Sequence, residues 1–244
     1  MATSTSPIKA EPRLGNLLLD ALDHDQRERL LETARVRPLK TGEVLAEPGE
    51  DVSSVFFPTS GTASILVTLI DVPQVEGSTI GREGIVEAFA ALGSGRHGNH
   101  QIVCQVEGTF IQLPVEDFIE QTSTPGRLQR LVHGYLQALF SQATLSVACN
   151  AVHHIPPRCA RWLLQTHDRV DGDHFDLTQE YLASMLGTHR PTVSIAASAL
   201  QEAGLIRYTR GSITVLDREG LEAEACECYE GIRSEYSRLV PLVG

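Results

Sequence analysis

The stretch that decides the fold is TQEYLASMLGTHRPTVS, residues 178–194. Thr178 is a typical helix N-cap, because its side-chain oxygen can accept a hydrogen bond from a first-turn N–H group. Glu180 places a negative charge near the positive end of the helix dipole. Gly187 is expected to end this helix, since glycine readily adopts the left-handed conformation found there. The sequence therefore predicts a short helix between Thr178 and Gly187.

A second helix is expected directly after this glycine. Thr188 is its predicted cap, and Pro191 fits its first turn, where a missing N–H group has no helical partner to lose. Arg190 then takes the second helical position. The helix is expected to run to about residue 203, with Gly204 as the glycine at its C-terminal end.

The two helices have the spacing of a helix-turn-helix. Ala183 is small where the helices would cross, Gly187 turns the chain, and Val193 would fill the wedge between the helices. Residues 205–216 then read as two strands joined by a turn, which is the β-hairpin "wing" of a winged helix. Together these features predict a DNA-binding domain.

The charge of this region supports that interpretation. Residues 187–211 contain three arginines and one acidic residue, a local net charge of +2 in a chain whose total is -11. With the second helix in the major groove, Arg190 is the candidate for a bidentate contact with guanine, worth about 1–3 kcal/mol of discrimination; a phosphate contact or simple solvation is the alternative. Side chains suited to phosphate contacts are Thr178, Gln179, Thr192, Ser198 and Arg210. His189, Pro191 and Ser194 complete the predicted interface with double-stranded DNA.

The N-terminal half has a different residue pattern. Short runs rich in β-branched and aromatic residues occur at residues 54–57, 63–69 and 101–106, and glycines often separate such runs. This pattern is typical of a barrel or sandwich of short antiparallel strands.

Residues 126–151 predict a long helix that contains no proline. Apolar residues follow two neighbouring stripes, one from Leu128 to Leu145 and the other from Val132 through Phe140 to Val147. We expect one stripe to pack on the barrel and the other on a symmetry mate; a single wide core face in a monomer is the alternative. The paired prolines at 156–157 are expected to end this helix, which makes residues 152–157 a predicted hinge.

Composition limits the remaining possibilities. The 244 residues are 42% hydrophobic and 21% charged, as in soluble globular proteins. No run approaches the roughly 18 apolar residues of a membrane span, and residues 1–13 lack the apolar core of a secretory signal. The five cysteines suit a reducing compartment better than a disulfide framework. These features predict a cytoplasmic protein that is not associated with a membrane.

The order of these parts resembles the Crp/Fnr family of bacterial transcription regulators, over roughly residues 15–220. Segments that carry the likeness are 42–45, 48–50 and 55–61 in the barrel and 182–183, 186–187, 190–193 and 204–206 in the DNA-binding part. The resemblance implies an α+β fold with an N-terminal antiparallel β-barrel (a double-stranded β-helix or jelly roll, like cyclic-nucleotide-binding domains), a long dimerisation helix and a C-terminal winged helix-turn-helix. The expected divisions are a tail at 1–13, the sensor barrel at 14–121, the dimerisation helix and hinge at 122–154, the DNA-binding domain at 155–220 and a C-terminal helix at 221–244.

The same resemblance implies a homodimer on a palindromic operator, with half-sites about one helical turn apart. RNA polymerase is a candidate partner, and the effector stays unidentified. The family's acidic and second basic reading positions fall at Pro191 and Ile195, so its familiar operator is not assumed.

The effector site departs from the family. Members that bind cyclic nucleotides hold the ligand with a Gly-Glu-Leu turn and an Arg-Ser or Arg-Thr pair. The corresponding region of this chain is residues 81–85 and 93–100, and it contains no such pair. Arg82, Glu83 and Arg96 are the candidate effector-binding residues, with a solvated loop as the alternative. An Fnr-type iron–sulfur sensor is not expected, because no cysteine precedes Cys104.

The remaining cysteines give weaker signals. Cys226 and Cys228 are expected on one helix over 221–239, where side chains two residues apart face different sides, so we expect no metal site and no cofactor. Cys149 and His153, four residues apart, could still form half of a metal or haem site, and a redox role with Cys149 or Cys159 is a second alternative.

No nucleophile–base pair, phosphate loop or carboxylate dyad is evident, so we expect no enzymatic activity. Two alternatives to a DNA-binding regulator without the usual cAMP pocket stay open. One is a cyclic-nucleotide-regulated activator with an atypical pocket, and the other is a small-molecule-binding barrel whose C-terminal domain binds protein.

Overall fold

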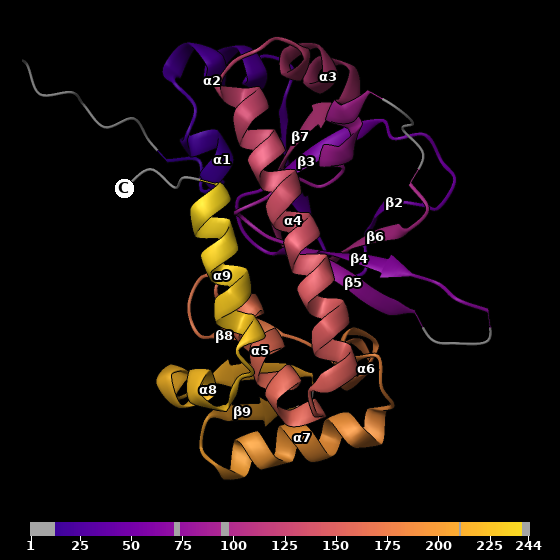
Figure 1. Cartoon of the computed structure of the whole chain (residues 1–244), viewed down its shortest axis with the longest axis vertical. Coiled ribbons are helices and arrows are strands. Elements are labelled where there is room, and N and C mark those ends of the chain that lie inside the picture. Colours follow the sequence, from indigo (N-terminus) through magenta and orange to yellow (C-terminus); the bar gives the residue numbers. More distant parts are fainter. Residues whose placement is uncertain (1–12, 71–73, 94–97, 210, 241–244) are drawn as a thin grey trace, which may run out of the picture.

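The computed structural model describes residues 13–70, 74–93, 98–209 and 211–240. Its N-terminal part combines β-sheets with short helices, a long helix runs down the molecule, and a smaller domain lies at the lower end in Figure 1. This arrangement confirms the predicted α+β class, in which antiparallel sheets precede a C-terminal helix-turn-helix.

Two short helices open the described chain, α1 (Leu17–Asp20) and α2 (His24–Leu31). Their N-caps are Asn16, whose side chain accepts from the N–H groups of Leu18 and Leu19, and Asp23, whose side chain accepts from Gln26. Asn16 is fully buried and also donates to the carbonyl oxygens of Pro58 and Gly84, each at 3.0 Å. The capping residue therefore also fastens the helices to the β-sheets.

Among the described residues, seven strands follow and form two antiparallel sheets, with the orders β1-β7-β3 and β2-β6-β4-β5. Their bounds are β1 Arg35–Leu39, β2 Val44–Ala46, β3 Ser54–Pro58, β4 Thr62–Val67, β5 Val75–Ile80, β6 Gln101–Val106 and β7 Gly108–Pro114. Buried side chains of both sheets share one core with α1, α3 and α4, including Phe57, Phe110 and Phe118. A 3₁₀ helix, η1 (Ala88–Leu92), lies between β5 and β6.

Helix α3 (Val115–Ser123) leads into the long helix α4 (Arg127–Val152). The structure corrects the role predicted for the two prolines. Helix α4 ends at Val152, and Pro156 and Pro157 lie in the first turn of α5 (Ile155–His167). The prolines therefore begin the next helix and do not end α4, because a first-turn proline loses no helical hydrogen bond. The break itself consists of His153 and His154.

The C-terminal domain contains α6 (Gln179–Leu186), α7 (Arg190–Glu202) and a three-stranded sheet in the order β8-β10-β9. The sheet strands are β8 His174–Asp176, β9 Ile206–Thr209 and β10 Ser212–Val215. The sequence did not predict β8. Its buried Phe175 pairs with Ile213 of β10, and only this pairing across the sheet identifies three residues as a strand.

The expected single C-terminal helix is wrong. Two helices occur instead, α8 (Arg218–Glu224) and α9 (Cys228–Leu239), separated by residues 225–227. Asp217 caps α8, whose start falls inside the range assigned to the DNA-binding domain. Helix α9 runs beside α4 (Figure 1), and its Ile232 and Tyr236 are buried in the core of the β-sheet part.

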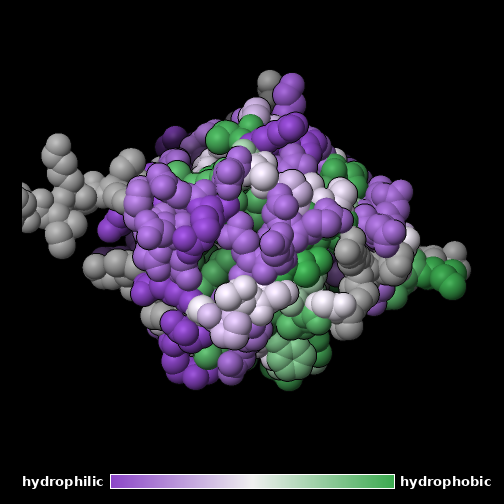
Figure 2. Space-filling view, turned by 90° about the horizontal axis from the view of Figure 1, so that it is seen from above, coloured by the Kyte–Doolittle hydropathy of each residue, from purple (hydrophilic) through white to green (hydrophobic). Residues whose placement is uncertain are grey.

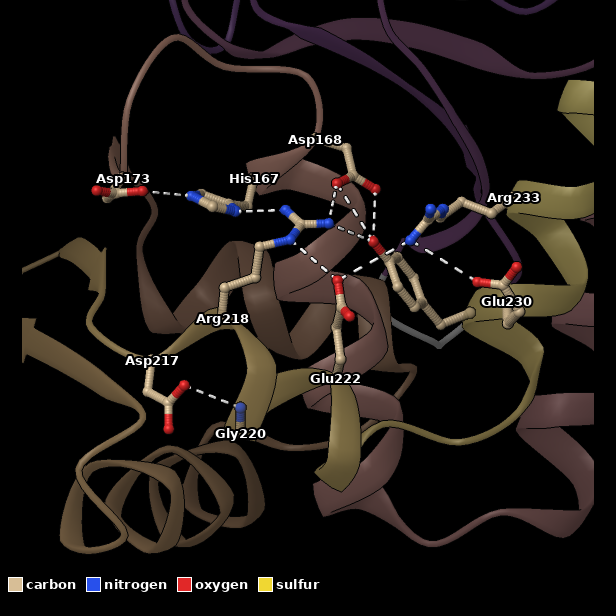
Figure 3. A network of polar contacts seen from close by, with 10 residues as sticks. His167, Asp168, Asp173, Asp217, Arg218, Gly220, Glu222, Glu230 and Arg233 are labelled. Carbon is tan, nitrogen blue, oxygen red and sulfur yellow. Dashed lines mark hydrogen bonds and ion pairs between the residues drawn. The ribbon is translucent and has the colours of Figure 1, made fainter.

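Arg218 fixes α8 against α5, as the polar network in Figure 3 shows. Its guanidinium donates to Asp168 at 2.6 Å, to the Tyr229 hydroxyl at 2.6 Å and to Nδ1 of His167 at 2.7 Å. Since Nδ1 of His167 accepts, Nε2 carries the proton and donates to Asp173 at 2.8 Å. The end of α5, the following loop and α8 are thus joined by charged hydrogen bonds.

None of the helices in the described part of the chain has the length and apolar character that spanning a membrane requires.

Candidate DNA interface

Local interactions form the helix-turn-helix as the sequence indicates. The Thr178 hydroxyl accepts from the Tyr181 N–H group at 3.2 Å and so caps α6. Gly187 follows α6 with a φ of 56°, in the left-handed region that glycine tolerates. Gly204, after α7, has a φ of 76°. These three predictions are confirmed.

The start of α7 corrects one prediction. The N-cap is His189, without a capping side-chain hydrogen bond, and Thr188 lies one residue outside the helix. Arg190 is consequently the first helical residue and not the second. Pro191 lies in the first turn as predicted.

The two helices pack through the residues expected at their crossing. Ala183 is 7% exposed and Val193 is fully buried in the core of this domain. The same core contains Trp162 from α5 and Ile213 from β10. Helices α5, α6 and α7 and the sheet therefore form one unit that holds α7 rigidly at the lower edge of the molecule in Figure 1.

The outward side of α7 is open to solvent. Its exposed residues include Arg190, Pro191, Ile195 and Ser198, and Ile195 is 72% exposed. The single carboxylate of the helix is Glu202, its last residue. The helix is thus neither packed away nor lined with negative charge, as contact with duplex DNA requires.

Gln179 links the two helices at this surface. Its Oε1 atom accepts from Nε of Arg190 at 3.1 Å and from Oγ of Ser194 at 3.0 Å. This shared acceptor orients the Arg190 guanidinium beside the first turn of α7. The sequence pattern predicted that Gln179 contacts a phosphate. That Gln179 also orients Arg190 is seen only in the folded structure, where α6 and α7 lie side by side.

The other predicted contact residues lie on the same end of the domain. Thr178 and His189 are exposed, and Thr192 is partly buried. The wing is the antiparallel pair β9–β10, with Thr209 opposite Ser212. Arg210 lies outside the described residues.

The candidate effector residues are engaged elsewhere. Arg82 donates to Asp171 at 2.9 Å, and Glu83 forms an ion pair with Arg169 at 2.8 Å, so both bind the segment after α5. They line a cavity of about 600 Å³ with residues of α5, α8 and α9. Arg96 lies outside the described residues. The effector role of these residues stays a prediction.

Strand β5 also contacts the DNA-binding domain. The Trp162 indole donates to Glu76 of β5 at 2.9 Å, and the Ser184 hydroxyl donates at 2.5 Å to the carbonyl of Gln74, the residue just before β5. Burial raises the pKa of Glu76, while hydrogen bonds from Trp162, Ser64 and Gln105 act in the opposite direction. The helix-turn-helix is therefore held against the β-sheet part by side chains that the sequence pattern did not single out.

Comparisons with known proteins agree with this geometry. Residues 157–224 match the family model described as a Crp-like helix-turn-helix domain. No curated protein matches the chain significantly.

Solved structures match about four fifths of this chain. A Crp-family transcriptional regulator from Thermus thermophilus has a TM-score of 0.65 at 18% identity, covering 78% of this chain and 96% of that one. FixK2 from Bradyrhizobium japonicum has a TM-score of 0.64 at 15% identity, with coverage of 79% and 98%. The c-di-GMP-responsive global regulator CLP from Xanthomonas campestris has a TM-score of 0.63 at 16% identity, with coverage of 79% and 99%.

At these identities the structures establish the fold, and the family model establishes the type of its C-terminal domain. The chain thus has the fold of the Crp/Fnr regulators with a Crp-like helix-turn-helix domain at residues 157–224, which confirms the family resemblance of its sequence.

Proposed function

We propose that this protein is a sequence-specific transcription regulator that binds a palindromic operator as a homodimer, with α7 in the major groove. The observation that carries the proposal is the exposed first turn of α7, where Gln179 orients the Arg190 guanidinium at 3.1 Å. A guanidinium held at the N-terminal end of a recognition helix can donate two hydrogen bonds to guanine O6 and N7.

The flanking residues support contacts with the DNA backbone. Thr178, Ser198 and Arg207 are exposed on the helices and wing that border this turn. Such groups position the domain on phosphates without reading bases. Because the rest of the chain is acidic, binding depends on this local surface and not on the total charge.

An apolar face on α4 supports the homodimer. Phe140 and Val147, seven residues apart, are 67% and 71% exposed. Seen from above in Figure 2, hydrophilic side chains cover most of the surface, and hydrophobic ones gather at the edge that faces the reader in Figure 1, where α4 runs. Burial of such a stripe against its symmetry copy would form a self-complementary two-fold interface.

The regulator acts in the cytoplasm under this proposal, with RNA polymerase as a candidate partner and no catalytic step of its own. The β-sheet part either senses a ligand or holds the DNA-binding domain through Glu76, Glu83 and Arg82.

Selection of genomic fragments by the purified protein, followed by fluorescence anisotropy on the selected site, tests this proposal. We expect the logarithm of affinity to fall linearly with the logarithm of salt concentration, with a slope of about -0.9 per neutralised phosphate. Arg190→Ala should reduce discrimination against single-base changes by about 1–3 kcal/mol at one position of each half-site.

Arg35→Ala is the matched control, because Arg35 is an exposed arginine on β1 in the N-terminal part. It should leave both affinity and base preference unchanged. Failure to select any sequence, or the same result for both arginine variants, would contradict the proposal.

A further inference from the structure

Four metal-ligating side chains meet at the lower end of α4, outside the DNA interface. Cys149, His153, Cys226 and Cys228 each present one ligand atom, and all four atoms lie within 4.8 Å of one another. The three cysteines are at most 7% exposed, and the His153 side chain is 21% exposed.

These residues come from separate parts of the chain. Cys149 lies on the last turn of α4, and His153 is its C-cap residue. Cys226 lies in the segment between α8 and α9, and Cys228 is the first residue of α9. Because α8 ends before Cys226 and α9 begins only at Cys228, the two cysteines do not lie on one continuous helix. Their thiols can therefore face the same centre.

The distances suit a single tetrahedral ion. Zn–S bonds of about 2.3 Å and a Zn–N bond of about 2.0–2.1 Å place neighbouring ligand atoms about 3.6–3.8 Å apart at tetrahedral angles. Here Sγ of Cys149 lies 3.5 Å from Sγ of Cys226, and Sγ of Cys228 lies 3.7 Å from Nδ1 of His153. The widest separation between two ligand atoms is at most 4.8 Å, so a movement of about 1 Å would bring that pair to the tetrahedral distance.

The far side of the histidine is oriented as in known zinc sites. Nδ1 of His153 faces the sulfur atoms, while Nε2 lies 3.2 Å from Oε1 of Glu227. A carboxylate bound to the second ring nitrogen fixes the tautomer and the ring orientation of a metal-ligating histidine. Glu227 therefore occupies the position of such a supporting group.

Two buried arginines suit the charge of the site. Three thiolates, a neutral imidazole and Zn²⁺ carry a net charge of -1. Arg158 and Arg161 are 6% and 5% exposed, and the charge of Arg161 favours the thiolate of Cys149. The Nε atoms of both arginines lack a hydrogen-bond partner among the described residues, so these two donors remain available to a negatively charged site.

We propose that Cys149, His153, Cys226 and Cys228 bind one structural Zn²⁺ ion that joins the end of α4 to the α8–α9 connection. On binding, the thiols release their protons to solvent, three in all if each starts protonated, and no electron is transferred. All four positions are filled by protein, which is typical of structural and not of catalytic zinc. The ion would brace the hinge from which the DNA-binding domain begins.

The first experiment measures metal in the full-length protein, purified under reducing conditions without an affinity tag that binds metal. We expect about one zinc per chain by elemental analysis. After chelation, addition of Co²⁺ should give the intense visible d–d absorption and the thiolate charge-transfer band of tetrahedral cobalt–sulfur coordination.

Substitutions then assign the ligands. Even changes to residues that only hydrogen-bond a metal ligand cost about 10–100-fold in metal affinity, so Cys228→Ser and His153→Asn should each cost at least that much. His153→Asn keeps the test usable if a buried cysteine variant fails to fold, because His153 is partly exposed. Glu227→Gln should weaken binding less than either.

Cys104→Ser is the matched control, since Cys104 is a buried free cysteine of β6 far from the cluster in the fold. It should keep the metal content and the cobalt spectrum of the parent. A reduced chain that holds no metal and gives no tetrahedral cobalt spectrum would overturn the proposal. So would a cobalt spectrum unchanged in both ligand variants, or a sulfide-containing iron cluster in place of one ion. Each readout is independent of DNA binding.

Discussion

Glu83 and Arg169 form a two-point ion pair that joins the turn after β5 to the segment after α5. Nη2 of Arg169 lies 2.8 Å from Oε1 of Glu83, and Nε lies 3.2 Å from Oε2. The Arg169 side chain is 6% exposed and also donates to Thr79. Gly81 leaves the required room, because a Cβ atom there would lie 2.4 Å from carbon atoms of Arg169.

Glu83→Gln should destabilise the protein markedly. It removes one charge from a nearly buried pair and leaves Arg169 without its counter-ion, which costs about 3–5 kcal/mol in comparable sites. Urea unfolding measures this as a lower free energy of unfolding. Glu50→Gln, at an exposed position, should change that free energy little; equal effects of the two substitutions would show that the ion pair does not hold the domains together.

Gln179→Ala should weaken base reading through Arg190. Without the acceptor at 3.1 Å, the guanidinium loses its preferred orientation, and we expect a loss of about 0.5–1.5 kcal/mol in discrimination. In the double variant with Arg190→Ala, the second substitution should add little, because both act through one contact.

Ser198→Ala is the control for this pair, since the loss of a phosphate contact lowers affinity equally for all sequences. Anisotropy with matched and mismatched operators measures each variant. Strictly additive effects of Gln179→Ala and Arg190→Ala would contradict the coupling.

The buried carboxyl of Glu76 should make stability depend on pH. Burial raises its pKa above 4.5 in the folded protein, so the folded chain keeps a proton that the unfolded chain loses. The unfolded state then binds fewer protons, and the free energy of unfolding falls as pH rises from 4.5 toward the folded pKa. Glu76→Gln, which can still pair with Trp162 and Ser64, should remove this fall. Urea unfolding of both proteins across that range tests the difference, and parallel pH curves would refute it.

Two glycines at the α4–α9 contact should respond in opposite directions to alanine. A Cβ atom on Gly134 would lie 2.3 Å from the Leu239 carbonyl oxygen, whereas one on Gly231 would lie 3.6 Å from Cδ1 of Leu145. Gly134→Ala should therefore cost about 1–3 kcal/mol through overpacking. Gly231→Ala should stabilise by about 0.5–1 kcal/mol through helix propensity. Thermal unfolding measures both, and a stabilising Gly134→Ala would mean that α9 does not lie this close to α4.

Replacing an exposed apolar residue of α4 by glutamate should break the proposed homodimer. A charge at Phe140 or Val147 would be buried without a partner between two symmetry copies. We expect Phe140→Glu and Val147→Glu to give monomers by light scattering after size exclusion. Val36→Glu, at a position that is 72% exposed on β1, should leave the mass unchanged. If both α4 variants remained dimeric, the dimer interface would have to lie on another surface.

The helix-turn-helix could be predicted almost completely because its signals are local. The cap at Thr178, the turn at Gly187 and the C-terminal Gly204 depend on neighbours within a few residues. The start of α7 was misplaced by one residue, since Thr188 and His189 are adjacent and cap preferences do not distinguish them sharply.

The sequence by itself determined the order of parts, the type of the DNA-binding domain and the presence of Arg190 in the first turn of its second helix, because helix periodicity, capping and turn chemistry act over short separations. Tertiary structure decided the rest. The pair of Glu83 and Arg169 joins residues 86 apart in sequence, and the contact of Cys149 with Cys226 joins residues 77 apart. Such contacts depend on how separate helices and sheets pack, and no pattern within a single segment encodes that packing.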